Sequence, residues 1–327
     1  MEDPEGFLDG LHGKRVILDE VHRLPNPSEL LKIAADHYKT IKIVATGYST
    51  LQASSKFRDT LTGRKEEVWL TPMNDGDLVD FQKQDLKHRL REGGLPPFFL
   101  GEAEKGRDCQ EWMDSYWAKD IQELFHLERH SSFQRFLELI LANSGGIFEA
   151  TKYAAPCEIS RTTIANYLSV LEATRVAHVI KPFSSHSPTE IISAPKVYGF
   201  DTGFVCYYRG WEELRPADYG NLWEHLALNE IASRGWFHKV RYWRDKRGHE
   251  VDFILARGPS RTPLAIECKW KADGFEIQSL KSFRERYPKG ENWIVCSDVD
   301  KPFRRREVDL ALEFIGLSHL SERLSGA

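Results

Sequence analysis

Two segments that each contain an apolar run, separated by a short turn, decide the expected fold of the C-terminal part of this chain. They are WRDKRGHEVDFIL (residues 243–255) and LAIECKW (residues 264–270), and the turn contains Gly-Pro-Ser-Arg at residues 258–261. This pattern predicts a β-hairpin. Because strand side chains alternate between faces, Glu267 and Lys269 should point the same way, and Asp252 on the partner strand can reach them. The sequence therefore predicts two carboxylates and a lysine at one end of a small sheet.

This set of side chains indicates metal-dependent chemistry on phosphate. Carboxylate oxygens bind Mg²⁺, and an amine stabilises the attacking water or the charge that develops on phosphorus. We therefore expect Asp252 and Glu267 to be metal ligands, and we expect these two acids and Lys269 to be catalytic. A Glu-x-Lys pair on an edge strand is also a common solvated surface, so a structural salt-bridge network is the alternative.

The Asp-x(n)-Glu-x-Lys arrangement resembles the signature of the restriction-endonuclease-like nucleases, the PD-(D/E)xK superfamily. A helix pattern over residues 221–234 and a strand at 240–243 precede the hairpin, and a helix (276–286) and a strand (293–297) follow it. This order suits that fold. Such nucleases often place one more acid on the first helix. Helical phase slightly favours Glu230 for burial, whereas the resemblance favours Glu224 as the residue that completes the metal shell.

Composition limits the possible partners and compartment. The 327 residues suggest two or three domains, and the net charge of −4 means that any nucleic-acid binding must use local basic patches. One candidate patch is Arg244, Lys246 and Arg247, beside the hairpin. Five cysteines without a Cys-x-x-Cys pair indicate a reducing compartment, and no apolar run is long enough to cross a bilayer. We therefore expect a cytoplasmic protein with no membrane association.

The N-terminal segment KRVILDE (residues 14–20) is an apolar strand that ends in two acids, as Walker B motifs do. In such a motif Asp19 would hold Mg²⁺ and Glu20 would polarise the attacking water. A second strand, residues 41–45, ends at Thr46, which would lie beside the acids and sense the γ-phosphate. Arg64 is either an arginine finger acting in trans or a surface arginine before a third strand at residues 67–70.

The segment ISRTTIANYLSVLE (residues 159–172) reads as a helix that begins after Ser160. Its apolar positions form a buried face and leave Arg161, Thr162 and Asn166 outward. A strand, a loop at residues 182–188 and another strand follow, so the middle of the chain is expected to be a winged helix. In DNA-binding examples the outward residues of this helix enter the major groove, whereas in other proteins the domain only packs against a partner.

Several segments in this order resemble a prokaryotic family of AAA ATPases with a C-terminal domain of unknown function 4143. The matching segments are residues 17–25, 46–49, 61–64, 93–96, 196–198, 201–203 and 243–253. The resemblance implies an α/β protein in four parts. These are a partial AAA-type P-loop sheet (1–72), a helical lid-like region (73–127), a winged-helix middle domain (128–190) and a restriction-endonuclease-like α/β domain (191–327).

One departure from that family concerns the phosphate loop. The run Gly-x-x-x-x-Gly-Lys-[Ser/Thr], which cradles the phosphates of ATP, occurs nowhere in the sequence. In the family it lies before the Asp19–Glu20 strand. ATP, the cofactor of the parent family, is therefore not expected to bind, and Asp19 and Glu20 are interpreted as remnants of a Walker B motif. The chain is expected to be N-terminally incomplete, and its exposed sheet edge should attract a protein partner or a second copy.

Together these patterns predict a DNA-associated protein with possible Mg²⁺-dependent phosphodiester cleavage. The alternative is a non-catalytic DNA- or protein-binding module with a degenerate nucleotide site. In that alternative the nuclease-like fold is a docking surface, since a fold does not fix a function.

Overall fold

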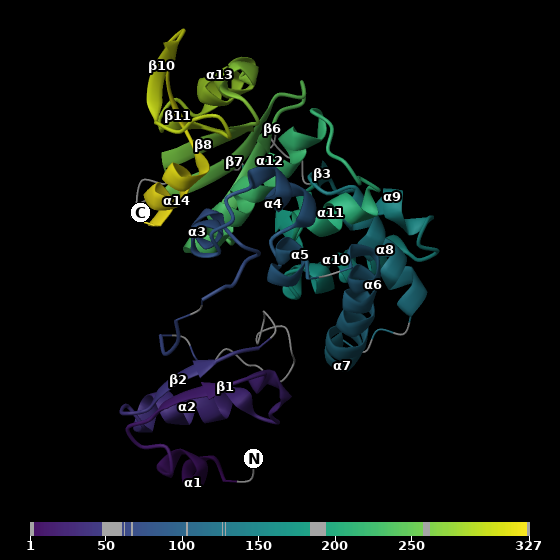
Figure 1. Cartoon of the computed structure of the whole chain (residues 1–327), viewed down its shortest axis with the longest axis vertical. Coiled ribbons are helices and arrows are strands. Elements are labelled where there is room, and N and C mark those ends of the chain that lie inside the picture. Colours follow the sequence, from purple (N-terminus) through teal and green to yellow (C-terminus); the bar gives the residue numbers. More distant parts are fainter. Residues whose placement is uncertain are drawn as a thin grey trace.

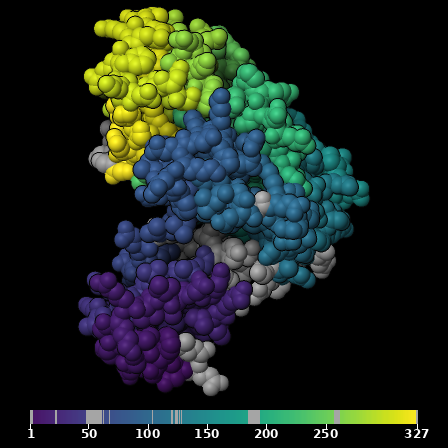
Figure 2. All heavy atoms as spheres, in the orientation of Figure 1, coloured from purple at the N-terminus to yellow at the C-terminus, as the bar shows by residue number. Residues whose placement is uncertain are grey.

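The computed structural model has a mixed α/β fold with three sheets that follow one another along the chain (Figure 1). It describes residues 3–47, 61, 63–66, 68–102, 104–125, 127, 129–183, 194–257 and 262–325. The expected hairpin turn at 258–261 and residues 184–188 of the expected loop lie outside these ranges, as do parts of the family segments 46–49 and 61–64. In Figure 2 the N-terminal part forms a lobe at one end of the molecule and the C-terminal sheet lies at the other.

The N-terminal lobe contains a two-stranded parallel sheet in which Val16 pairs with Ile43. A small core of Leu8, Leu30, Ala34 and Ile41 covers one face. The other face carries Ile17 and Val44, whose exposed fractions are 75% and 62%. The elements are α1 (Pro4–Asp9), β1 (Arg15–Leu18), a 3-10 turn (Val21–Arg23), α2 (Pro27–His37) and β2 (Lys42–Ala45).

The expected third strand at residues 67–70 is wrong for residues 68–70, which are not in a strand. Trp69 instead packs edge-on against His178 and Phe237, with ring centroids 5.4 and 4.6 Å away, and the Arg175 guanidinium lies 4.7 Å from its ring centre. Trp69 therefore attaches this stretch to the rest of the chain, whereas its neighbours Val68 and Leu70 are exposed.

The middle of the chain is mostly helical and ends in a small antiparallel sheet of order β3-β5-β4. On α10 the predicted cap is confirmed, because the Ser160 Oγ accepts a hydrogen bond from the Thr163 N–H at 3.1 Å. The elements are α3 (Asp75–Asp80), α4 (Leu86–Glu92), α5 (Pro96–Leu100), α6 (Lys105–Tyr116), a π-helical turn (Trp117–Ile121), α7 (Gln122–Phe125), α8 (His130–Ala142), β3 (Gly146–Ile147), α9 (Ala150–Ala154), α10 (Arg161–Ala173), β4 (Ala177–Ile180), β5 (Lys196–Gly199) and α11 (Thr202–Tyr208).

Strand β5 lies on the C-terminal side of the expected domain boundary at residue 190, yet it is the central strand of this middle sheet. It pairs with β4 from Ala177↔Gly199 to Ile180↔Lys196, and with β3 through Gly146↔Val197. The middle unit therefore continues through β5 and into α11, which packs against α4 and α8.

The C-terminal part is a six-stranded sheet of order β10-β11-β9-β8-β7-β6 with helices on both faces. The predicted order of helix, three strands, helix and strand is confirmed. Helices α12 and α14 cover one face and α13 covers the other. The elements are α12 (Asp218–Ile231), a π-helical turn (Ala232–Trp236), β6 (Val240–Arg244), β7 (Glu250–Arg257), β8 (Thr262–Lys269), α13 (Gln278–Arg286), β9 (Asn292–Cys296), β10 (Phe303–Glu307), β11 (Leu310–Ile315) and α14 (Leu317–Ser325).

Two further observations bear on the predictions from composition. All five cysteines are buried and carry free thiols. Among the described residues, no helix is long and apolar enough to cross a membrane.

Candidate functional site

The hairpin of β7 and β8 brings the predicted acids together. Its antiparallel register pairs Phe253 with Ile266, which makes Asp252 and Glu267 the next opposite positions. The Asp252 Oδ2 accepts a hydrogen bond from the backbone N–H of Cys268 at 2.8 Å. The Asp252 carboxylate therefore lies against β8 at the residue between Glu267 and Lys269.

An irregularity in the strand pairing occurs at the same point. Arg241 of β6 pairs with Ile254, but Trp243 pairs with Val251, so Asp252 and Phe253 share the single position opposite Tyr242. Such a bulge bends the strand and changes the direction of a side chain, and bulges are frequent beside active sites. The alternation of strand residues could not have revealed it.

Burial and mutual repulsion hold the two carboxyl groups away from their ordinary titration ranges. Burial, with a further contribution from the charge on Glu224, raises the pKa of Asp252 to about 6. Burial and the neighbouring Asp252 raise the pKa of Glu267 well above its usual value. Glu267 is only 3% exposed, and its Oε1 has no hydrogen-bond partner in the described part of the chain. Ionising both carboxyls in the folded protein therefore costs free energy. A bound cation would lower that cost.

Lys269 supplies positive charge on one side of the acids. Its Nζ lies 3.2 Å from the Glu267 Oε2. Burial alone would lower the pKa of this amine, but attraction from Asp252 and Glu267 raises it above its usual value. Lys269 is therefore an ammonium ion that can hold an anionic group close to the acids.

Glu224 of α12 lies on the other side, in a buried ion network that the sequence reasoning missed. The Lys196 Nζ lies 2.9 Å from the Glu224 Oε1 and 2.6 Å from the Glu250 Oε1. The Tyr198 hydroxyl donates a hydrogen bond to the same Oε1 of Glu224. The only signal in the sequence was the Lys-x-Tyr spacing on one strand, which does not say which carboxylates those side chains meet.

The alternative first-helix acid, Glu230, lies elsewhere on α12. It is fully buried, and its Oε1 accepts a hydrogen bond from the backbone N–H of Asp75 at 2.5 Å. Helical phase therefore correctly favoured Glu230 for burial, but it is Glu224 whose charge acts on Asp252.

Mg²⁺ is the metal ion that suits the oxygen donors of this site. Within the described ranges, no three His, Cys, Asp or Glu side chains are grouped closely enough to form a ready-made metal centre. Mg²⁺ does not require one, because it keeps several waters and commonly binds through one or two carboxylates together with substrate phosphate. Asp252 and Glu267 fit this requirement, and the unpartnered Oε1 of Glu267 is an available ligand atom.

Of the predicted nucleotide-site residues at the N-terminus, Asp19, Glu20 and Thr46 lie together, and Arg64 pairs with another residue. The parallel pairing of β1 and β2 places Thr46 against the acids. Its Oγ1 donates a hydrogen bond to the Asp19 Oδ1 at 2.5 Å and accepts one from the Glu20 N–H at 3.0 Å. Arg64 instead forms an ion pair with Asp36 of α2, with 2.6 Å between the Nε and Oδ1. Its function as an arginine finger stays a prediction.

The predicted nucleic-acid residues lie on two separate units. Arg161, Thr162 and Asn166 are all exposed on α10, as expected. Lys246 and Arg247 are exposed in the turn between β6 and β7. Arg244 is partly exposed and lies 3.5 Å from the Glu250 Oε2, at the edge of the buried network.

Three family models match consecutive parts of the chain. Residues 2–79 match a model described as an AAA domain, residues 83–215 match the domain of unknown function DUF8612, and residues 219–315 match the domain of unknown function DUF4143. The chain thus has a segment similar to AAA domains and a C-terminal segment similar to DUF4143. The uncharacterized protein MJ1544 of Methanocaldococcus jannaschii is 24% identical over 267 residues. The alignment covers 74% of this chain, which spans 58% of the length of that relative.

The acidic site is not confined to the DUF4143 domain. Asp252, Glu267, Glu224 and Glu250 belong to the DUF4143 match, whereas Lys196 lies within the DUF8612 match. The DUF8612 segment thus contributes the buried cation that contacts Glu224 and Glu250.

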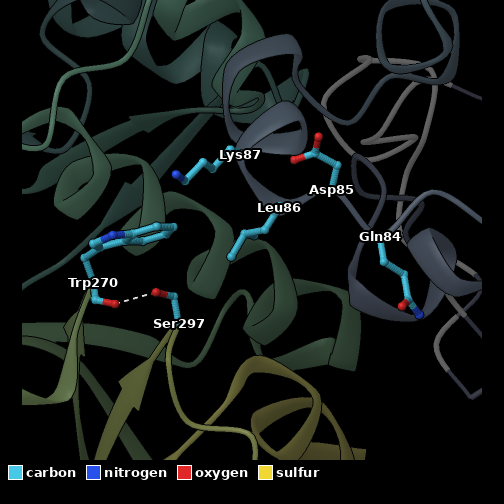
Figure 3. Close-up of a pocket in the computed structure, with 6 residues that line it drawn as sticks. All are labelled: Gln84, Asp85, Leu86, Lys87, Trp270 and Ser297. Atoms are coloured by element: carbon cyan, nitrogen blue, oxygen red, sulfur yellow. Dashed lines mark hydrogen bonds between the residues drawn. The ribbon is translucent and has the colours of Figure 1, made fainter.

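An open hollow of about 580 Å³ lies where the same two segments meet, and Figure 3 shows its lining. Trp270, the residue after Lys269, forms one wall and stacks on Tyr219 with ring centroids 4.6 Å apart. The Lys87 ammonium lies 5.7 Å from the centre of the Tyr219 ring. The hollow therefore offers an aromatic surface and a cation directly beside the acid–lysine end of β8. Its lining residues are Gln84, Asp85, Leu86, Lys87, Trp270 and Ser297.

Proposed function

We propose that this protein is a DNA-associated, metal-dependent phosphodiesterase whose active site is the Asp252–Glu267–Lys269 cluster of the DUF4143 domain. The observation that carries this proposal is the convergence of the buried Glu267 carboxyl, the half-buried Asp252 carboxyl and an ammonium group at one end of β8. Structural ion networks also perturb pKa values, but here two carboxyls and an ammonium group meet at one strand end beside an open hollow.

Each residue has a distinct function in the proposed reaction. Asp252 and Glu267 would hold Mg²⁺, and Glu224 would complete the shell. When bound, the ion supplies Lewis acidity and neutralises charge on the phosphate. Lys269 orients the attacking water and stabilises the negative charge that builds up on the phosphoryl oxygens. A DNA strand that passes over the hollow could stack a base on Trp270 and place a phosphate near Lys87.

Cleavage of supercoiled and linear DNA in the presence of Mg²⁺ or Mn²⁺ tests this proposal. Asp252→Ala and Lys269→Ala should each lower the cleavage rate by about a hundredfold or more, because each removes several kcal/mol of transition-state stabilisation. Asp273→Ala and Lys271→Ala, at exposed positions just after β8, are the matched controls and should cleave at the wild-type rate. If the wild type binds DNA without cleaving it, the chain is instead a non-catalytic DNA-binding module.

We propose that the middle unit is a winged helix that presents α10 to the major groove. The order α8, β3, α9, α10, β4, β5 with a three-stranded antiparallel sheet supports this interpretation. Ile164, Leu168 and Leu171 are buried, so the opposite face of α10 is free to contact DNA. The exposed turn with Lys246 and Arg247 would add phosphate contacts from the DUF4143 domain.

Arg161→Ala should weaken DNA binding several-fold and reduce the slope of log K against log salt by about one, because one phosphate contact is lost. Asn166→Ala should weaken binding with little change in that slope, because an amide releases no counterion. Ser169→Ala, on the exposed face of the same helix, is the control. Fluorescence anisotropy at several salt concentrations measures all three. Unchanged affinity and slope for Arg161→Ala would make α10 a packing surface.

For the AAA segment we propose binding to a protein instead of ATP hydrolysis. The Asp19–Thr46 hydrogen bond agrees with the expected Walker B strand end, and the run Gly-x-x-x-x-Gly-Lys-[Ser/Thr] that cradles a triphosphate does not occur in these 327 residues. The exposed Ile17 and Val44 on one face of the β1–β2 sheet support coverage by a partner chain or a second copy.

A further inference from the structure

We propose that Lys196 takes the place of a second metal ion, so that the site between β7, β8 and α12 holds one divalent cation per chain. This inference rests on the proposed function and adds the metal stoichiometry of the site and the identity of its second cation. Its basis is the position of Lys196, on a strand outside the DUF4143 match, between two acids of the site.

The contacts of Lys196 are those of a buried, fully engaged ammonium ion. Its side chain is 5% exposed, and its Nζ lies within 2.9 Å of one carboxylate and 2.6 Å of another. The Glu224 Oε1 also accepts a hydrogen bond from Tyr198, whose ring is 5.5 Å from the same Nζ. One oxygen of Glu224 and one of Glu250 are therefore already committed to a cation that the protein supplies.

Two-metal hydrolases bridge two ions about 3.5–4 Å apart with shared carboxylates. Here the acids divide into two pairs. Asp252 and Glu267 lie on the Lys269 side, whereas Glu224 and Glu250 are held by Lys196. Because Lys196 lies between the carboxylates of the second pair, Glu224 and Glu250 cannot share a second metal ion. Glu224 can then only help to complete the shell of the one ion held by Asp252 and Glu267.

The balance of charge also indicates one divalent cation per chain. Four carboxylates, those of Glu224, Glu250, Asp252 and Glu267, are accompanied by three basic side chains, Lys196, Lys269 and Arg244. With all of them ionised, the cluster carries one excess negative charge. One divalent ion and one phosphodiester bring the total to neutrality, whereas a second divalent ion would leave two uncompensated positive charges in a partly buried site, which is costly.

The origin of Lys196 gives this arrangement a structural consequence. Strand β5 is hydrogen-bonded to β4, and α10 packs against β4. The unit that presents α10 is therefore the unit that supplies the fixed cation. The site is complete only when the DUF8612 and DUF4143 segments are packed together.

The test is a Mn²⁺ titration of the full-length chain, with free Mn²⁺ followed by electron paramagnetic resonance. We expect one Mn²⁺ per chain for the wild type and for Lys196→Arg, which keeps the charge. Lys196→Met keeps the approximate side-chain volume but frees Glu224 and Glu250, and should bind two. Lys271→Met, at an exposed position, is the matched control and should bind one.

The outcomes distinguish failure of the inference about Lys196 from failure of the proposed phosphodiesterase function. Two Mn²⁺ per wild-type chain, with DNA cleavage present, would overturn the inference about Lys196 and leave the proposed function intact. A single Mn²⁺ bound with unchanged affinity by folded Lys196→Met would also overturn it. A wild-type chain that binds no Mn²⁺ would overturn the proposed function and the inference together. The wild-type stoichiometry decides the question even if Lys196→Met does not fold.

Discussion

Replacement of Gly203 by alanine is expected to lower the free energy of unfolding by about 3 kcal/mol, the upper end of the usual cost of overpacking. Gly203 lies in the first turn of α11, where that helix touches the end of α4. A Cβ at this position would lie 2.3 Å from the carbonyl oxygen of Glu92 and 2.9 Å from the backbone nitrogen of Gly93. Both atoms belong to the main chain, so no side-chain rotation can relieve the clash.

The surroundings of Gly203 leave little room for the backbone to move. The Asp201 carboxylate accepts hydrogen bonds from the Gly94 N–H at 2.6 Å and from the Gly203 N–H at 2.8 Å. Gly93 has a φ of 90°, and a Cβ there would meet the Asp201 Oδ1 at 2.1 Å. Arg89, fully buried beside them, donates from its Nε to the Met73 carbonyl at 2.9 Å. Moving α11 away from α4 would break several of these contacts together.

Urea unfolding followed by tryptophan fluorescence measures the effect. The control is Gly220→Ala in α12, where an added Cβ meets no atom within 4 Å. That change should be neutral or stabilise by up to about 1 kcal/mol, because alanine favours a helix more than glycine does. Equal unfolding midpoints for the two variants would show that the close contact of α11 with α4 costs nothing to disturb.

The same region shows which features the sequence could predict. The Gly93-Gly94 and Asp201-Thr202-Gly203 segments were recognised as matching a family pattern, but their contact joins residues 107 positions apart. Periodicity and spacing act locally, so they predicted the β7–β8 hairpin, the cap and buried face of α10, and the pairing of Thr46 with Asp19. They could not predict that two distant motifs meet.

For the ion pairs as well, the sequence predicted contacts between residues close in sequence and not between distant ones. Glu267 and Lys269 are two residues apart on one strand, and their alternation was enough to place them together. Lys196 reaches Glu224 and Glu250 across 28 and 54 residues of sequence, and only the packing of β5 against α12 and β7 reveals it. The expectation of a strand over residues 67–70 failed for a related reason. Trp69 packs against two aromatic rings and not against a neighbouring strand, and Val68 and Leu70 are exposed.

Glu230→Gln is expected to stabilise the protein at pH 8 and to change its stability little at pH 5. Burial raises the pKa of Glu230 to about 7, from a value near 4.5 in the unfolded chain. The folded state therefore binds the proton more tightly, and the stability this contributes is complete below about pH 4.5 and is lost as the pH rises through 7. At pH 8 the wild type buries a charged carboxylate that is shielded from water, since Glu230 has no exposed surface. Glutamine keeps an acceptor for the Asp75 N–H and removes the charge, for a gain of about 1–3 kcal/mol.

Urea unfolding of the wild type and the variant at pH 5 and pH 8 isolates this effect. Asp252 and Glu267 also have raised pKa values, but they titrate in both proteins, so the difference between the two pH profiles belongs to Glu230. Glu111→Gln, on α6 with a side chain that is 69% exposed, is the control and should run parallel to the wild type. If the Glu230→Gln profile were also parallel, Glu230 would be ionised in the folded protein across this range. Its hydrogen bond to Asp75, together with its other polar contacts, would then fully offset the cost of its burial.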